Sequence, residues 1–372
     1  MRKITYIHQR PDWPNFSWNH EKLEPILAHV RHRQGRLIGR MEGLGFSSQS
    51  EAVLATLTQD VVKSSEIEGE ILNHDQVRSS IARRLGIAIA GAIPSDRDVE
   101  GVVEMMLDAT QRFADPLTQP RLFGWHAALF PTGYGGIHPI RVGAWRDDSK
   151  GAMQVISGPI SRERVHFEAP AAKRLQQEMS TFLAWANSAS HPMVDPVLKA
   201  AIAHLWFVTI HPFDDGNGRI ARAIADWALA RSEGSPQRFY SMSSQIRAER
   251  SAYYDILERT QKSTLDITDW LQWFLACLDR AITATETTLG AVFRKAAFWD
   301  KHAEATINPR QQKMLNKLFD GFEGKLTSTK WAMIAKCSQD TAARDIQGLI
   351  DQCILVKDAA GGRSTSYSLA EF

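Results

Sequence analysis

The residues best suited to chemistry lie in one short stretch, residues 211–222. His211 is a titratable group that can take a proton from a hydroxyl. Behind it, Gly216 and Gly218 allow successive backbone N–H groups to converge, and the helix expected to begin there adds the positive end of its dipole. This combination of a base and an anion-binding loop predicts transfer of a phosphate-linked group.

Charged side chains around the loop support the same chemistry. Arg219 and Arg222 are three residues apart, so on a helix both can face one anion. Asp215 offers the hard oxygen ligand that Mg²⁺ accepts when nucleotide phosphates bind most of the ion. Asp214, next to it, is expected to be solvated. The sequence therefore predicts a magnesium–nucleotide site with His211 beside it.

Residues 211–222 match the signature H-x-F-x-[DE]-G-N-G-R-x-x-R at every fixed position, and in this stretch the chain resembles the Fic family. Members of that family are mostly adenylyltransferases, which move AMP from ATP to a hydroxyl side chain of a target protein and release pyrophosphate. The resemblance implies that His211 deprotonates the target hydroxyl and that Asp215 holds Mg²⁺. The phosphate contacts that it implies come from Gly216, Asn217, Gly218, Arg219 and Arg222.

Two further segments resemble parts of the same family. Residues 155–158 resemble the strand of the family's flap, which aligns the target segment by strand addition. Residues 250–254 resemble the lining of the adenine pocket, although Tyr253 and Tyr254 are adjacent on a helix and one of them could belong to the core. The family has an asparagine near the position of Gln261, and this departure concerns the ribose contact. The residues implied to contact ATP are Glu68, Val155, Ile156, Ser157, Gly158, His211, Asp215, Gly216, Asn217, Gly218, Arg219, Ile220, Ala221, Arg222, Tyr253 and Tyr254.

A second informative feature is the acidic end of an expected helix at residues 63–70. Glu66 and Glu68 lie in its last turn, where the helix dipole disfavours acids, so one of them is expected to have a cationic partner. The stretch resembles the family's inhibitory motif [ST]-x-x-x-E-[GN], with Ser64, Glu68 and Gly69 at its fixed positions. The resemblance implies that Glu68 pairs with Arg222 and blocks placement of the ATP γ-phosphate, as in the self-inhibited class with an N-terminal inhibitory helix. From the residues alone, an exposed helix end is the alternative.

The elements that must position these residues are mostly helices. Apolar residues recur at helical spacing in 23–38, 53–62 and 99–107, and further helices are expected at 171–187, 194–210, 218–232, 247–261 and 268–298. The second helix should begin near Ser50 and end at Gly69, a left-handed cap. Asn73, with Gln76 as capping partner, should begin the third helix, and Ser95 the fourth. Glycine-rich residues 141–170 around a β-prone run predict a β-hairpin.

Pro309 opens a separate unit. Its apolar pattern indicates three helices, the third capped by Ser338, and then a hairpin of residues 354–356 and 365–369 joined across Gly361 and Gly362. This order resembles the winged-helix family, in which Gln339, Thr341 and Arg344 would meet base edges and Arg363 would lie in the wing. Residues 302–372 hold nine Lys and Arg against eight Asp and Glu. This balance makes protein contact or dimerisation at least as favoured as DNA binding.

Composition excludes several classes of protein. The 372 residues carry 44 Lys and Arg against 42 Asp and Glu, and 44% are hydrophobic, which excludes a mainly disordered chain and a surface that coats nucleic acid throughout. Three widely spaced cysteines exclude a disulfide framework and a C-x-x-C metal pair. With no targeting segment and no apolar stretch that could span a bilayer, the expected location is the cytoplasm.

These observations predict a mainly α fold: a Fic-type helical bundle with a β-hairpin flap, an N-terminal helical extension and a C-terminal winged-helix domain. The expected divisions are an N-terminal helical region with the inhibitory helix at 1–115, a catalytic core at 116–285, a linker helix at 286–308 and the winged-helix domain at 309–372.

The expected function is a self-inhibited adenylyltransferase that uses Mg²⁺ and ATP on Ser, Thr or Tyr hydroxyls of target proteins. Self-modification and homodimer formation are left open. Two alternatives remain: removal of AMP or transfer of another phosphate-linked group at the same site, and a DNA-binding regulator whose nucleotide site acts as a sensor.

Overall fold

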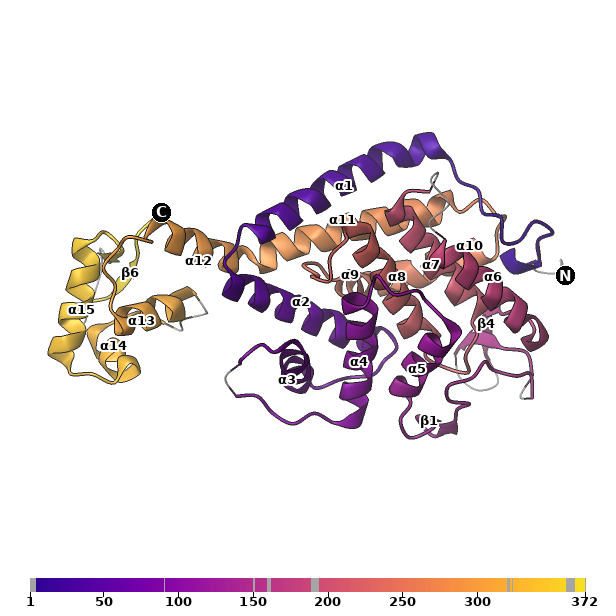
Figure 1. Ribbon diagram of the computed structural model, residues 1–372, viewed down its shortest axis with the longest axis horizontal. Coiled ribbons are helices and arrows are strands. Elements are labelled where there is room, and N and C mark those ends of the chain that lie inside the picture. Colours follow the sequence, from indigo (N-terminus) through magenta and orange to yellow (C-terminus); the bar gives the residue numbers. More distant parts are fainter. Residues whose placement is uncertain are drawn as a thin grey trace. The chain divides into compact units, whose positions relative to one another are not determined.

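The computed structural model describes residues 5–89, 91–149, 151–158, 162–188, 194–319, 322, 324–358 and 365–371. The chain divides into two compact units, one of Met1–Glu42 with Ser50–Thr285 and one of Gly43–Gln49 with Glu286–Phe372. The fold is mainly helical, as the sequence predicted (Figure 1).

The first elements along the chain are the 3₁₀ helix η1 (Ile7–Gln9), α1 (His20–Glu42), α2 (Phe46–Ile67), α3 (His74–Leu85), α4 (Arg97–Gln111), α5 (Gln119–Leu129), β1 (Tyr134–Gly135), β2 (His138–Pro139), β3 (Gln154–Ser157), β4 (Arg164–Glu168), η2 (Ala172–Arg174), α6 (Leu175–Asn187), α7 (Pro196–Ile210) and α8 (Asn217–Glu233). They are followed by α9 (Met242–Ala248), α10 (Arg250–Gln261), α11 (Thr268–Thr288), α12 (Gly290–Lys301), α13 (Pro309–Phe319), α14 (Ser328–Ala335), α15 (Gln339–Asp351), β5 (Leu355–Lys357) and β6 (Tyr367–Leu369).

Helices α7 and α8 form the centre of the larger unit. Nearly every residue of α7 from Val197 onward is buried, which explains why this helix is apolar on all sides. It begins at an Asp195 N-cap with Pro196 in the first turn, a favourable start for a helix. Trp270 of α11 donates its indole N–H to the Ala201 carbonyl, and α1 lies along α11, where Arg33 donates to Asp279 (Figure 1). The two helices that carry the motif are therefore held in a rigid core.

The expected hairpin is present and consists of β3 and β4, paired antiparallel. Its register shifts between Val155 and Ile156, so that β4 has one extra residue there, His166. Phe167 of β4 packs into a small cluster with Tyr6 and Ala169, which anchors one face of the hairpin. All four residues of β3 are partly or fully exposed.

Several helix boundaries differ from the prediction. Helix α2 begins at Phe46, not near Ser50, because Gly45 accepts the first backbone hydrogen bonds and a glycine is tolerated at an N-cap. The single helix expected at 247–261 is two helices, α9 and α10, with Glu249 outside helical geometry between them. The single helix expected at 268–298 is likewise two, α11 and α12, and the break falls beside Gly290, whose type weakens a helix.

Two cap predictions also need correction. Asn73 does cap α3, since its side chain accepts from the N–H groups of Asp75 and Gln76. The Gln76 side chain does not complete a capping box, because it accepts instead from the N–H of Asp96. The second correction concerns α4, which begins at Arg97 and has Asp96 rather than Ser95 at its N-cap.

Among the described residues of the smaller unit, α12 is followed by three helices, α13 to α15, and then by the β5–β6 hairpin, in the expected order. Ser338 caps α15 by accepting from the Thr341 N–H, as predicted. Tyr367 of β6 also forms a bridge with Leu326, which adds a third short extended segment. The predicted turn residues Gly361 and Gly362 and the predicted wing residue Arg363 lie outside the described residues.

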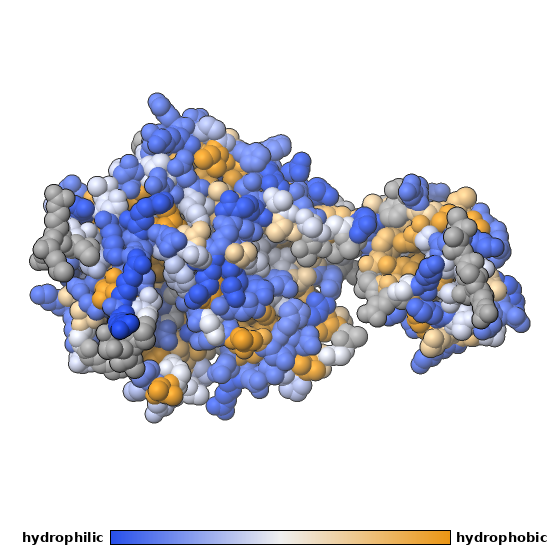
Figure 2. All heavy atoms as spheres, turned by 180° about the vertical axis from the view of Figure 1, so that it is seen from behind, coloured by the Kyte–Doolittle hydropathy of each residue, from blue (hydrophilic) through white to orange (hydrophobic). Residues whose placement is uncertain are grey.

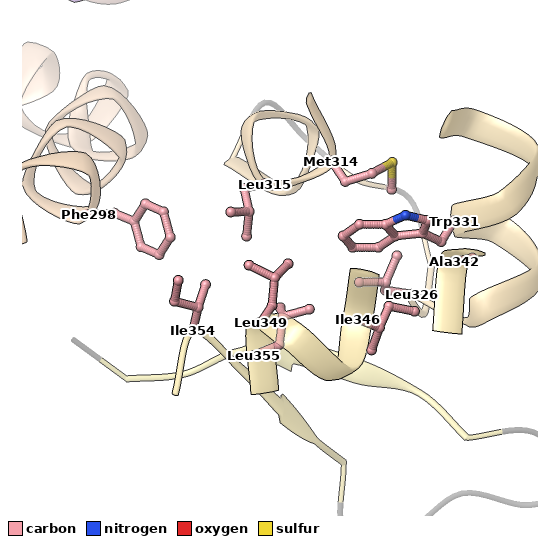
Figure 3. Packing of buried hydrophobic residues seen from close by; sticks show 10 residues of the cluster. All are labelled: Phe298, Met314, Leu315, Leu326, Trp331, Ala342, Ile346, Leu349, Ile354 and Leu355. Atoms are coloured by element: carbon pink, nitrogen blue, oxygen red, sulfur yellow. The ribbon is translucent and has the colours of Figure 1, made fainter. Parts of the chain in front are cut away.

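Side chains from α12, α13, α14 and α15 contribute to the core of the smaller unit. Figure 3 shows Trp331 lying between Met314 above it and the Ala342 and Ile346 side of α15, with Leu349 facing Leu315. The buried set is Phe298, Met314, Leu315, Leu326, Trp331, Ala342, Ile346, Leu349, Ile354 and Leu355. This unit thus has a hydrophobic core of its own.

Figure 2 shows the opposite face of the molecule, where hydrophilic side chains predominate on the larger unit and hydrophobic ones form separate small areas, whereas hydrophobic side chains cover a broader area of the smaller unit. Among the described residues, no helix combines the length and the apolar character that crossing a membrane would require. Cys277, Cys337 and Cys353 are all free thiols.

Candidate active site

The loop between α7 and α8 holds the predicted motif in a defined shape. His211 ends α7 in a left-handed conformation with φ of 51°, which is uncommon for a residue with a side chain and concentrates at functional sites. Asn217 then clasps the loop, because its side-chain amide donates to the Phe213 carbonyl and its side-chain oxygen accepts from the Phe213 N–H. Phe213 itself is buried and stacks on His126 with ring centroids 4.2 Å apart. The loop is therefore fixed from both sides.

The ring of His211 is held in one tautomer. Its Nδ1 lies 3.2 Å from the Val208 carbonyl, which can only accept a hydrogen bond, so Nδ1 carries the proton and Nε2 keeps a free lone pair. Burial lowers the pKa of His211 to about 4, and the positive charge of Arg146 acts in the same direction. At neutral pH His211 is therefore an unprotonated base.

Arg146 is a residue of this site that sequence reasoning missed. It is 3% exposed. Its Nε donates to the His211 carbonyl over 2.8 Å, and one of its two terminal nitrogens donates to the Pro170 carbonyl. Its backbone N–H donates to the Pro212 carbonyl. Arg146 thus ties the catalytic loop to the end of the hairpin, and a lone arginine 65 residues before the motif gave no sign of this in the sequence.

The start of α8 provides the anion site. Gly216 has φ of 78°, and a Cβ there would lie 2.9 Å from the Phe130 ring, so only glycine fits. The first N–H groups of α8 after Gly216 have no acceptor within the helix and point toward its N-terminal end. The Asp215 carboxylate stands beside them, exposed, with one oxygen accepting from the Gly216 N–H.

The end of α2 meets this anion site. Glu68 lies 2.8 Å from the guanidinium of Arg222, which is 2% exposed. The Arg222 Nε and a terminal nitrogen also donate to the side chain and the carbonyl of Ser64, both over 2.9 Å. Arg219 forms an ion pair with Glu70 in the same way. Both motif arginines are therefore paired with residues at the end of α2.

The Glu68 carboxylate sits directly on the start of α8. A Cβ built on Gly218 would come within 2.1 Å of its Oε1, and the Tyr254 hydroxyl donates to its Oε2 over 3.3 Å. Burial of this carboxylate acts to raise its pKa, but the charge and hydrogen bonds of Arg222 outweigh burial and hold the pKa below its ordinary value. Glu68 is therefore a charged group that occupies the mouth of the anion site.

Backbone geometry explains why Glu68 is placed so firmly. Helix α2 ends in a Schellman motif, in which the Glu70 N–H bonds to the Ser65 carbonyl and the Gly69 N–H bonds to the Glu66 carbonyl. Gly69 has the predicted positive φ, 89°. The carbonyl of Ile67 in the last turn accepts from the Arg250 side chain over 2.7 Å.

A cavity of about 630 Å³ opens in front of the loop, a size typical of sites for nucleotide-sized ligands. Of the predicted ATP contacts, all of which the structure describes, those that line it are Glu68, Val155, Ile156, Ser157, His211, Asp215, Gly216, Asn217, Gly218, Tyr253 and Tyr254. The others do not line it, namely Gly158, Arg219, Ile220, Ala221 and Arg222. The two arginines lie behind the carboxylates of Glu68 and Glu70, and Ile220 and Ala221 belong to the core.

The tyrosine pair divides between two roles. Tyr253 is 1% exposed and its hydroxyl lies 2.9 Å from His204 Nε2 inside the core. Tyr254 instead reaches Glu68 and lies beneath the Arg250 guanidinium, 5.1 Å from the ring centre. Gln261 lines the cavity and donates to the Thr209 hydroxyl over 3.2 Å.

Comparison with known proteins now bears on this geometry. Residues 116–229 match the Fic/DOC family. They form a Fic domain. Residues 6–87 match a domain of unknown function, DUF4172. The Fic domain therefore contains the hairpin, α7, the His211 loop and most of α8, whereas Glu68 comes from the region that matches DUF4172.

Similar curated proteins carry related names. The chain is 25% identical to the protein adenylyltransferase Fic of Aedes aegypti over 278 residues, which are 71% of this chain and 50% of that protein. It is 24% identical to the protein of the same name from Nematostella vectensis, covering 64% of this chain and 51% of that protein. The chain thus spans about half the length of these relatives.

Solved structures share the fold. A Fic family protein from Desulfovibrio desulfuricans covers 93% of this chain, and 96% of that chain is covered, with 20% sequence identity and a TM-score of 0.56. A Fic domain containing signalling protein from Bacteroides thetaiotaomicron covers 70% of this chain, with 97% of its own length covered, 23% identity and a TM-score of 0.52. At such identities these structures establish the fold alone.

Proposed function

We propose that this protein is a protein adenylyltransferase, which transfers AMP from Mg·ATP to a Ser, Thr or Tyr hydroxyl of a target protein. One observation carries the proposal: an unprotonated His211, the start of α8 and the Asp215 carboxylate face a single cavity of about 630 Å³. The names of the curated relatives support the same activity.

In this proposal His211 Nε2 takes the proton from the target hydroxyl. The hydroxyl oxygen then bonds to the α-phosphorus of ATP, the bond from that phosphorus to the bridging oxygen breaks, and pyrophosphate leaves. The positive end of α8 stabilises the negative charge that develops on the phosphate oxygens. The hydrogen bond from Nδ1 to Val208 keeps the lone pair of Nε2 directed away from the helix and toward the cavity.

The residues present fit a magnesium ion bound mainly through nucleotide phosphates. The described residues contain no group of three or more His, Cys, Asp or Glu side chains that could form an all-protein metal cage. A single exposed carboxylate, Asp215, stands beside the anion site, and Mg²⁺ commonly takes one or two carboxylates together with substrate phosphates. The ion would neutralise phosphate charge during transfer.

The hairpin would supply the contact for the target. Within the part of the chain that the structure describes, this sheet consists of β3 and β4, so the other edge of β3 offers backbone groups that can accept a further strand. Ile156, 50% exposed, lies on this strand at the cavity. We infer that an extended target segment pairs with β3 and thereby brings its hydroxyl to His211.

Glu68 would act as a brake on this activity. Its carboxylate occupies the start of α8 and neutralises Arg222, the two features that would otherwise receive the distal phosphates of ATP. Arg219 is held by Glu70 in parallel. Movement of the end of α2 away from α8 would release both arginines.

The test is covalent transfer from ATP labelled at its α-phosphate, with Mg²⁺, into the protein and a cell lysate. On lysate proteins we expect more label with Glu68→Gly than with wild type, and none with His211→Ala in either background. Label that persists on lysate proteins with His211→Ala would refute the role of the base. If ATP binds but no variant transfers label, removal of AMP becomes the better assignment, which an adenylylated protein substrate would then examine directly.

A further inference from the structure

The β3–β4 hairpin, which would form the flap, and the neighbouring helix α10 together carry a second group of residues that can do chemistry. The hydroxyl of Ser157, at the end of β3, lies 2.5 Å from His166 Nε2. The other nitrogen of that ring, Nδ1, lies 2.6 Å from a carboxylate oxygen of Glu258 on α10. Ser157, His166 and Glu258 all line the cavity that holds His211.

The orientation of this group is that of a nucleophile with its base. The Glu258 carboxylate can only accept a hydrogen bond, so Nδ1 of His166 carries the proton and Nε2 is left to accept from the Ser157 hydroxyl. Desolvation acts to raise the pKa of Glu258, but hydrogen bonds from His166, Lys262 and Arg164 outweigh it and lower the pKa to about 2. A serine hydroxyl that donates to an oriented imidazole is the arrangement that activates serine for attack.

The backbone shows that His166 is directed to this place. His166 is the extra residue of β4 at the register shift opposite Val155 and Ile156. Such bulges turn a side chain out of the regular alternation and are frequent beside active sites. Without this extra residue, β4 would pair with β3 in regular alternation, and the side chains of β4 near Ser157 would be arranged differently.

Anchoring of the flap does not account for Ser157. The hairpin is already tied to α10 by Arg164, which donates to Glu258 over 2.9 Å, and by the His166–Glu258 bond. The Ser157–His166 bond lies within the hairpin and links it to nothing else. Ser157 is moreover exposed, where a hydrogen bond adds little to stability.

We propose that Ser157 is an activated nucleophile that accepts AMP from ATP bound in the same cavity, so that the flap itself is a modification site. This inference rests on the proposed adenylyltransferase function. The Ser157 oxygen bonds to the α-phosphorus, the bond to the bridging oxygen breaks, pyrophosphate leaves with its electron pair, and the hydroxyl proton passes to His166 Nε2. Because acceptor and nucleotide share one cavity, the step gains from proximity.

The first experiment incubates the full chain and its Glu68→Gly variant with Mg·ATP and maps modified peptides by mass spectrometry. We expect one AMP on Ser157, absent in Ser157→Ala, and formed at least about 100-fold more slowly in His166→Gln. Arg164→Gln is the matched control, because it removes an ion pair from Glu258 but leaves the His166–Glu258 bond. Ser149→Ala is the second control, since Ser149 is an exposed serine that donates to the Asp147 carboxylate and not to an imidazole.

A fluorophosphonate probe, which labels activated serines, examines the nucleophile without ATP. Labelling of Ser157 that exceeds that of Ser149 and falls in His166→Gln and Glu258→Gln supports the inference. Equal labelling of the two serines would overturn it.

AMP on lysate proteins or on other residues of the chain, with none on Ser157, would overturn self-modification at the flap but leave the adenylyltransferase function intact. No AMP on any protein, from any variant, would overturn both.

Discussion

Substitution of Glu68 offers the sharpest test of whether the contact between the end of α2 and the start of α8 restrains activity. The Glu68–Arg222 ion pair, at 2.8 Å with Arg222 2% exposed, is a charge-assisted contact of a kind that contributes about 1.5–3 kcal/mol. The longer bond from Tyr254, at 3.3 Å, adds about 0.5 kcal/mol. The arrangement in which Glu68 occupies the start of α8 is therefore favoured by about 2–3.5 kcal/mol, which corresponds to a factor of about 30 to 400.

We expect Glu68→Gly to raise the initial rate of AMP transfer by this factor, at ATP concentrations well below saturation. Arg222 keeps both of its bonds to Ser64 in the variant, so the arginine should stay in place and become available to phosphate. The assay is incorporation of α-labelled AMP at matched protein and Mg·ATP concentrations.

Glu66→Gly is the matched control, because Glu66 lies in the same helical turn but pairs with Lys63 and Arg247. It should leave the rate within about twofold of wild type. Equal rates for wild type and Glu68→Gly would show that the ion pair does not restrain catalysis. An equal rise in both variants would show that loosening of α2, rather than loss of the Glu68 carboxylate, is responsible.

Four further predictions follow from the contacts at the site. Because burial lowers the pKa of His211 to about 4, the rate of AMP transfer should not fall on this group's account between about pH 8 and 6, and a fall near pH 6.5 would contradict that environment. The pKa of Glu68 in the folded protein is lower than its ordinary value of 4.5. The charged carboxylate therefore contributes fully to stability above the ordinary pKa, and this contribution is lost as pH falls through the folded-state pKa. Melting temperatures of wild type and Glu68→Gln should accordingly converge below about pH 4.5. Arg146→Met leaves the His211 and Pro170 carbonyls unpaired, and urea unfolding should show a loss of about 2–6 kcal/mol, at about 1–3 kcal/mol for each. Gly218→Ala should lower the melting temperature in wild type, where its Cβ meets Glu68, and much less in Glu68→Gly, whereas equal losses would place Glu68 elsewhere.

The loop between α7 and α8 could be interpreted from the sequence because its residues are contiguous. His211, the two glycines and Asp215 lie within eight positions, so their chemistry and spacing could be interpreted together. The caps at Asn73 and Ser338 were also predictable, since a side-chain cap depends only on neighbouring residues.

What the sequence did not predict depends on contacts between distant segments. Arg146 meets the His211 carbonyl across 65 residues, and Glu258 meets His166 across 92. The bulge that turns His166 toward Ser157 is a matter of strand register, which no local pattern specified. The breaks at Glu249 and Leu289 were missed because apolar periodicity continues across each of them.

In the proposed inhibition, stability and control would be joined through the ends of two helices. An acid in the last turn of α2 is unfavourable for that helix, because the negative end of its dipole lies there. In the folded protein the same carboxylate of Glu68 lies at the positive end of α8, beside Arg222, where a negative charge is favoured. A phosphate that entered this site would use the same electrostatic stabilisation, so Glu68 and the nucleotide would compete for one place. The strength with which Glu68 holds α2 to α8 would then set the strength of inhibition, and any partner that draws the end of α2 away would raise the affinity for Mg·ATP by the same free energy.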